Sequence, residues 1–187
     1  MLEKALDGTR KVSLWLTWIG GSLIVLSAIL VTVEVFLRKL FNVSIGGADE
    51  ISGYAFAIAT SFSLAYALFE RAHIRVDALF NVMPRWLQPI INFLSLFLLL
   101  GFALIVVIMV WDMVADTLKY GSRSITPMRV PLTWPQIPWL LGWMFFVFSG
   151  VLLSFVALKR LAARDTAGAN ALIGIKTMDE QIQDESV

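Results

Sequence analysis

Cysteine is absent from this 187-residue sequence, and histidine occurs only once. A chain without cysteine forms no disulfide, offers no thiol nucleophile and cannot ligate an iron–sulfur cluster. One histidine cannot supply both axial ligands of a bis-histidine haem. These absences exclude a large group of membrane redox proteins, and we expect neither a catalytic residue nor a cofactor or metal site in this chain.

Charge is also scarce. Charged residues make up 16% of the sequence, against roughly 25% in soluble domains. The formal net charge of +1 gives no electrostatic basis for binding nucleic acid. Hydrophobic residues reach 58% and the mean hydropathy is +0.78. Four long stretches contain no Asp, Glu, Lys, Arg or His at all, namely residues 12–33, 51–69, 86–111 and 130–158.

Each uncharged stretch is long enough to cross a bilayer. A helix rises about 1.5 Å per residue, so roughly 20 apolar residues span a hydrocarbon core about 30 Å thick. Open strands and loops would leave backbone N–H and C=O groups unpaired in lipid. The sequence therefore predicts an all-α membrane protein. Its four-helix membrane domain covers residues 13–160, with spans at about 13–36, 51–69, 87–111 and 135–158.

The two ends differ from this domain. Residues 1–12 place Leu2, Ala5 and Leu6 at helical spacing beside three basic residues, which predicts an amphipathic helix in the membrane interface, with a frayed end as the alternative. Residues 161–187 become polar and acidic, and we expect a mobile tail there. Ten of the fifteen Lys and Arg residues lie in the N-terminal segment, the second loop and the tail, which predicts that both termini are cytoplasmic.

The second span carries small residues at every fourth position, Gly53, Ala57, Ser61 and Ala65, with a parallel row beginning at Ala55. Small side chains let helices approach closely, and this packing drives association in lipid. We expect this helix to lie centrally, against helices of this chain or of a partner subunit. The alternative is that alanine merely favours helix formation. The third span is bulky all round, which suits membrane lipid or a broad apolar contact.

No ionisable residue lies near the middle of a span, although a proton relay, a voltage sensor or a charged-substrate path normally requires one. The deepest is Glu34, four residues before Arg38. This order favours an ion pair on one helix face. We expect a local structural pair, and a coupling-ion ligand is the weaker alternative.

Acidic residues also open the second span. Asp49 and Glu50 are placed to interact with the positive end of that helix and to cap its N–H groups. Alternatively, they form an ionic cluster with the basic pair Arg38 and Lys39 on the outer face.

Two connecting loops carry further candidates. In the second, His73 and Asp77 are close enough to bond if the segment is helical, and bracing of the turn is favoured over catalysis because no nucleophile or metal ligand accompanies them. The third loop is rich in proline and carries Arg123 and Arg129. It either docks a soluble protein or caps the bundle.

These loop residues carry a family resemblance. The segments VEVFLRKLFNVSIGGADEIS from Val33, AYALFERAHIRVDAL from Ala65 and TPMRVPLTWPQIPWLLGW from Thr126 resemble, in that order, the small DctQ-like membrane subunit of tripartite ATP-independent periplasmic (TRAP) transporters. The resemblance covers about residues 10–160. Each motif alone is weak, and their combination with four spans is more specific.

The resemblance implies a multi-pass scaffold in the bacterial inner membrane. In this family a large DctM-like membrane subunit carries the substrate and sodium sites. A periplasmic DctP-like binding protein delivers an organic acid such as a C4-dicarboxylate or sialic acid. The alternative from another class is a membrane anchor for a respiratory or signalling complex. A small autonomous channel or enzyme is disfavoured by the missing polar lining, thiols and metal ligands.

Overall fold

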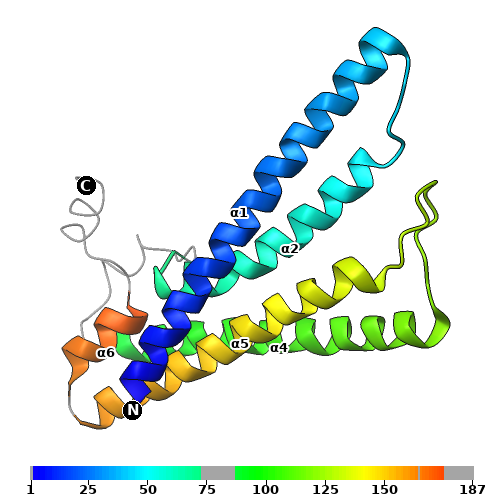
Figure 1. Cartoon of the computed structure of the whole chain (residues 1–187). Helices are drawn as coiled ribbons and strands as arrows, with labels where there is room; N and C mark the ends of the chain where they lie inside the picture. The colour runs from blue at the N-terminus through cyan, green and yellow to red at the C-terminus, as the bar shows by residue number, and fades with distance from the viewer. Residues whose placement is uncertain (1, 73–86, 164, 175–187) are drawn as a thin grey trace.

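A computed structural model describes residues 2–72, 87–163 and 165–174 of the chain. These residues form helices α1 (Leu2–Phe41), α2 (Ala48–Phe69), α4 (Gln88–Tyr120), α5 (Thr133–Ala162) and α6 (Thr166–Ile173), as Figure 1 shows. Within the described ranges, four helices are long and apolar enough to cross a membrane: α1, α2, α4 and α5. The predicted all-α, four-span membrane protein is confirmed, and the side on which the termini lie stays a prediction.

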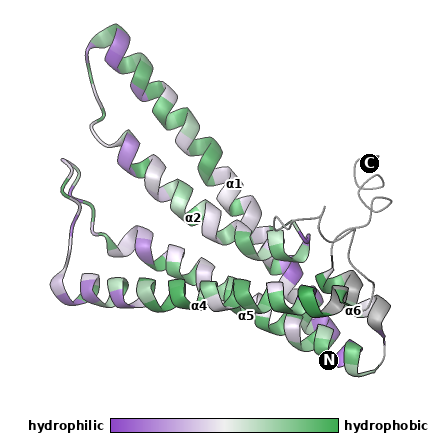
Figure 2. Ribbon diagram, turned by 180° about the vertical axis from the view of Figure 1, so that it is seen from behind, coloured by the Kyte–Doolittle hydropathy of each residue, from purple (hydrophilic) through white to green (hydrophobic). Residues whose placement is uncertain are grey.

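The helices form two antiparallel hairpins. Helices α1 and α2 lie side by side, as do α4 and α5, and α2 also packs against α5. Figures 1 and 2 show that the hairpins converge near the N-terminus and α6 and diverge towards their opposite ends. The α1–α2 connection and the α4–α5 connection therefore share one end of the molecule, which we call the loop end.

Helix α1 is longer than its predicted span. It runs without a break through 40 residues, about 60 Å, so the expected separate helix over residues 1–12 is continuous with the first span. Its position in the interface stays a prediction. Helix α4 likewise continues past residue 111 to Tyr120. Both exceed the roughly 30 Å hydrocarbon core, so they tilt or extend beyond it.

Part of the predicted tail, residues 161–187, is helical in the structure. Residues 166–173 form α6, and its Ala169 and Ile173 are buried. The Arg160 guanidinium fixes this corner, because it donates to the Gly168 carbonyl at 3.2 Å and to the Glu3 carboxylate at 2.8 Å. The start of the chain, the end of α5 and α6 are thereby joined. The tail prediction for residues 175–187 lies outside the described residues.

Helix α2 occupies the centre, as its small residues predicted. At Gly20 of α1 an added Cβ would lie 3.0 Å from the Ala59 Cα, and at Gly142 of α5 one would lie 2.9 Å from the Ser61 carbonyl carbon. Such distances leave no room for a side chain, so two glycines set the approach of α2 to its two neighbours. In the predicted row, Ser61 and Ala65 are buried, Ala57 is half-buried and Gly53 is exposed.

Much of the outer surface is apolar. The side chains of Trp15, Trp18 and Phe97 are each about 70% exposed, and Figure 2 shows hydrophobic residues along much of α1 and α4. In water such an area would be a liability, whereas lipid or another membrane protein covers it without cost. The chain therefore has room for a large membrane neighbour on either hairpin.

Candidate functional site

The polar groups at the loop end surround Glu34. This residue is only 2% exposed although it lies near the end of α1. One of its oxygens accepts hydrogen bonds from the Ser44 hydroxyl at 2.6 Å and from Arg38 Nη2 at 3.0 Å, and the other accepts from the Ile45 backbone N–H at 2.7 Å. The predicted local pair of Glu34 and Arg38 is confirmed.

These bonds fix the α1–α2 loop onto α1. Helix α1 ends at Phe41, where Asn42 adopts a left-handed conformation (φ 53°), and the chain turns back so that Ser44 and Ile45 reach the carboxylate. A buried carboxylate is costly unless it is paired and hydrogen-bonded, and here both oxygens are occupied. This arrangement favours a structural role for Glu34 over the coupling-ion alternative.

A second carboxylate joins α2 to the loop between α4 and α5. Glu50 accepts a hydrogen bond from the Tyr54 hydroxyl at 2.5 Å and another from the Thr126 hydroxyl. The Thr126 hydroxyl is also bonded to that of Ser124, at 2.8 Å. Residues far apart in the sequence are thus held together at the loop end. We call Glu34, Arg38, Ser44, Glu50 and Thr126 the loop junction.

In the described part of the chain, Asp49 and Glu50 form neither the side-chain cap of α2 nor the ionic cluster with Arg38 and Lys39 that were considered as alternatives. No ion pair joins either residue to Arg38 or Lys39 among the described residues, because Arg38 turns back along its own helix to Glu34. The N-cap of α2 is Gly47, and no side chain caps it. Asp49 is exposed. Both carboxylates still lie in the first turn of α2, where they interact favourably with the helix dipole.

The loop between α4 and α5, residues 121–132, is an ordered hairpin. The Ser124 N–H donates to the Val130 carbonyl at 2.9 Å, and the Leu132 N–H donates to the Ser122 carbonyl at 3.1 Å. Its Met128 side chain packs against Gly47 at the start of α2, where an added Cβ would collide with the Met128 sulfur. The loop therefore caps the bundle, one of the two alternatives.

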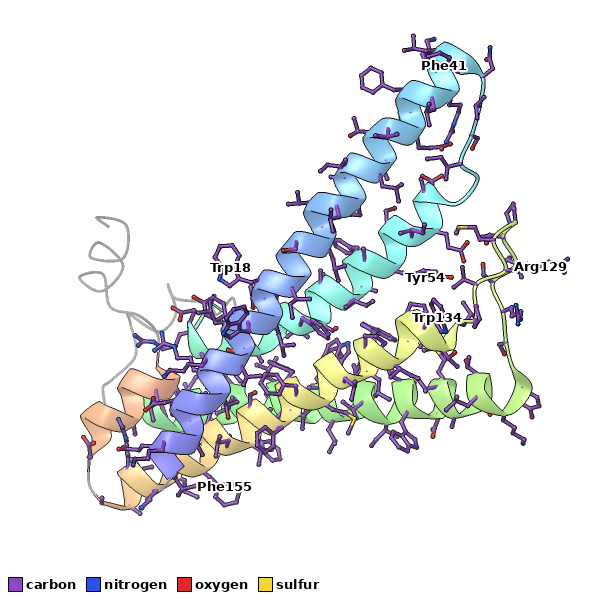
Figure 3. All side chains as sticks on the ribbon, viewed as in Figure 1. Trp18, Phe41, Tyr54, Arg129, Trp134 and Phe155 are labelled. Atoms are coloured by element: carbon purple, nitrogen blue, oxygen red, sulfur yellow. The ribbon has the colours of Figure 1, made fainter. Side chains whose placement is uncertain are left out.

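The same loop also presents its basic residues outward. Arg123 and Arg129 are both exposed, and Figure 3 shows Arg129 pointing away from the helices. Capping the bundle and docking a soluble protein are therefore compatible. A rigid loop that exposes two guanidinium groups is suited to carboxylates on another protein, because each group can form two parallel hydrogen bonds.

The loop junction encloses a cavity of about 220 Å³, lined in part by Glu34, Arg38, Glu50 and Pro127. The described part of the chain has no cluster of three His, Asp or Glu side chains able to hold a metal ion. It likewise contains no nucleophile beside a histidine, since the single histidine lies at position 73. The junction is chemically suited to holding loops together.

At the opposite end, Glu70 follows α2 and pairs with Arg10 of α1 at 2.7 Å. This ion pair ties the end of α2 to α1, a contact that was not predicted from the sequence. His73 and Asp77 lie outside the described residues. The contacts of Arg160 with Glu3 and with the Gly168 carbonyl were not predicted from the sequence either.

Three participants at the loop end were also missed. Tyr54 stands four residues after Glu50, a spacing that places both on one helix face and would have suggested the contact. No sequence pattern pointed to Ser44 or Thr126, because hydroxyl residues are common in loops and the spacing to their carboxylate partners is not regular.

Comparison with known proteins gives a consistent result. Residues 24–164 match the family described as "Tripartite ATP-independent periplasmic transporters, DctQ component". A protein of Haemophilus influenzae, provisionally named a TRAP transporter small permease protein, is 35% identical over 74 residues. That match covers 40% of this chain and 46% of the relative, so the chain spans about half the length of the curated relative it matches. No solved structure matches the chain.

Proposed function

Because the chain belongs to the DctQ component family of TRAP transporters, we propose that it is the fixed scaffold subunit of such a transporter. The family is a transporter component and not an enzyme. In the proposal, this chain holds a larger DctM-like subunit in the bacterial inner membrane and helps a periplasmic DctP-like receptor to dock. Sodium binds the larger subunit, and the cargo is an organic acid such as a C4-dicarboxylate or sialic acid.

One observation carries the proposal. Among the described residues, Glu34 is the only buried charged side chain, and its carboxylate is already bonded to Arg38, Ser44 and the Ile45 N–H. A carrier for an anion and sodium needs polar ligands that are free to bind them. This structure supports placing the transport path in another subunit. The exposed apolar faces of α1 and α4 supply surface for that subunit to cover.

Purification and reconstitution test the scaffold role. The full chain, tagged and extracted from its native membrane, should copurify with a many-spanning DctM-like permease. Proteoliposomes that contain both membrane subunits, a DctP-like receptor and a sodium gradient should accumulate the organic acid, whereas this chain with the receptor should not. Full uptake by this chain without the permease would refute the proposal. Recovery of a redox or kinase subunit instead would favour the membrane-anchor alternative.

Charge reversal tests receptor docking. We expect Arg123→Glu and Arg129→Glu to raise the receptor concentration needed for half-maximal uptake about tenfold each, since exposed charges act mainly on encounter with a partner. The maximal rate and the yield of the membrane complex should not change. Lys11→Glu, which reverses an exposed charge at the opposite end, is the control. An unchanged half-maximal concentration in both arginine variants would remove these residues from the docking surface.

A further inference from the structure

A groove of about 520 Å³ runs between α4 and α5. Its walls include Phe93, Phe97 and Gly101 from α4 and Val151, Phe155 and Leu158 from α5. Ser154 contributes the hydroxyl among the lining residues, and that hydroxyl donates to the Gly150 carbonyl of its own helix at 2.8 Å. The groove therefore offers mainly hydrocarbon contacts, and the hydroxyl proton of Ser154 is already bonded within α5.

The groove lies in one half of the membrane domain. Its residues come from the first half of α4 and the last half of α5, which meet at the end of the molecule that carries α6. Figure 3 shows Phe155 at that end. Phe97 and Phe155 are 73% and 62% exposed, so the groove opens sideways to the surrounding lipid. A molecule entering it would come from the leaflet at the α6 end.

A positive charge marks the end of the groove. Lys159 follows Leu158 directly and stands four residues after Phe155, so it continues the same face of α5. It is exposed, and the described part of the chain provides it with no ion-pair partner. Its neighbour Arg160 is engaged by Glu3 and by the Gly168 carbonyl. One ammonium group is thus available where the hydrocarbon surface ends.

The width of the groove separates two possible occupants. A helix is about 10–12 Å across, so it would cover the open side of the groove without its backbone entering between α4 and α5. An acyl chain is narrower and flexible, and a volume of this size is ordinary for a small-molecule site. Basic residues at the membrane surface attract anionic headgroups.

We propose that the α4–α5 groove binds an acyl chain of an anionic phospholipid whose phosphate contacts Lys159. The site is a property of this chain and does not depend on the proposed transporter role. The bound lipid fills the space between two helices and supports their packing from the membrane side.

Gly101 provides a direct test, because a Cβ there meets nothing within 4 Å and a larger side chain can enter the groove without displacing backbone. The full chain, purified in detergent, is titrated with phosphatidylglycerol, and bound lipid is counted by native mass spectrometry. Gly101→Leu should weaken binding of the first lipid at least about tenfold. Gly21→Leu, at an equally open position on α1, should bind as the native chain does. Equal binding by Gly101→Leu and the native chain would overturn the proposal.

The headgroup contact is tested with lipid of another charge. Lys159→Gln should abolish the preference of the native chain for phosphatidylglycerol over phosphatidylcholine, expected at about fivefold, whereas Lys11→Gln should retain it. The absence of any preference in the native chain would overturn the assignment of an anionic lipid. If Gly101→Leu left lipid binding intact and instead released a larger membrane subunit, the groove would hold a partner helix and the proposal would fail.

Discussion

Replacing Gly142 with alanine is expected to lower the thermal stability of the full chain, although alanine is the better helix former by about 1 kcal/mol. An alanine Cβ at this position would lie 2.9 Å from the carbonyl carbon of Ser61 and nearer still to the Ser61 side chain. Because the obstacle includes backbone of α2, a rotamer change cannot relieve the collision. The two helices must move apart, and the packing around Phe146 and Ala65 loosens with them.

The expected size follows from the cost of overpacking, about 1–3 kcal/mol and more when backbone must shift. Leucine should therefore be worse than alanine. For a chain of this length 1 kcal/mol corresponds to about 2–4 °C in melting temperature. We expect Gly142→Leu to melt at least about 5 °C below the native chain, measured by fluorescence-detected unfolding in detergent, with Gly142→Ala between them.

Matched glycines serve as controls. Gly21 and Gly53 lie in α1 and α2 with nothing within 4 Å of an added Cβ, so alanine there should leave the melting temperature unchanged or raise it. Combining Gly142→Ala with Ser61→Gly should restore part of the loss, because it removes the Ser61 side chain but not its backbone. A Gly142→Ala chain as stable as the Gly21→Ala chain would contradict the close contact between α2 and α5.

The four spans could be predicted from the sequence because lipid excludes both charges and unpaired backbone, and therefore leaves one solution for each uncharged stretch. The central position of α2 was also predictable, since small residues such as Ala57, Ser61 and Ala65 recur at every fourth position. This spacing identifies the face of α2 that packs closely, but not which helices pack against it. That Gly20 and Gly142 supply the opposing surfaces became visible only in the structure.

Helix ends and long-range polar contacts were harder to predict from the sequence. Helix α4 continues to Tyr120 because backbone hydrogen bonding and the burial of Val114 persist beyond the uncharged stretch, whereas the predicted boundary was set at the first charged residue, Asp112. Helix α6 is short and follows the charged end of α5, so the sequence predicts it only as part of the polar tail. Packing of Ala169 and Ile173 holds it against the rest of the chain. The bond between Thr126 and Glu50 joins the α4–α5 loop to the start of α2, and the approach of these two segments depends on how the hairpins are packed.

Replacing Glu34 is expected to free the α1–α2 loop. Alanine would remove the acceptor of the Ser44 hydroxyl, the Ile45 N–H and the Arg38 guanidinium together. Hydrogen bonds to a charged group are among the stronger ones, and donors left unpaired after truncation add a desolvation cost. Glutamine retains the shape and one acceptor oxygen but loses the ion pair, so Glu34→Gln should have a smaller effect than Glu34→Ala.

Limited proteolysis measures how much the end of α1 and the α1–α2 loop are destabilised by the loss of these hydrogen bonds. Trypsin cuts after Arg38 and Lys39, and the last turns of α1 must open before the enzyme can bind them, so the rate reports how often this segment unfolds. We expect cleavage there to accelerate at least about tenfold in Glu34→Ala, and less in Glu34→Gln. Glu3→Ala, which breaks the ion pair of α1 with Arg160, should leave this site protected because Glu3 lies at the other end of the helix. Unchanged cleavage in Glu34→Ala would show that the loop is held by the contact of Met128 with Gly47 and by packing of α2, and not by the buried carboxylate.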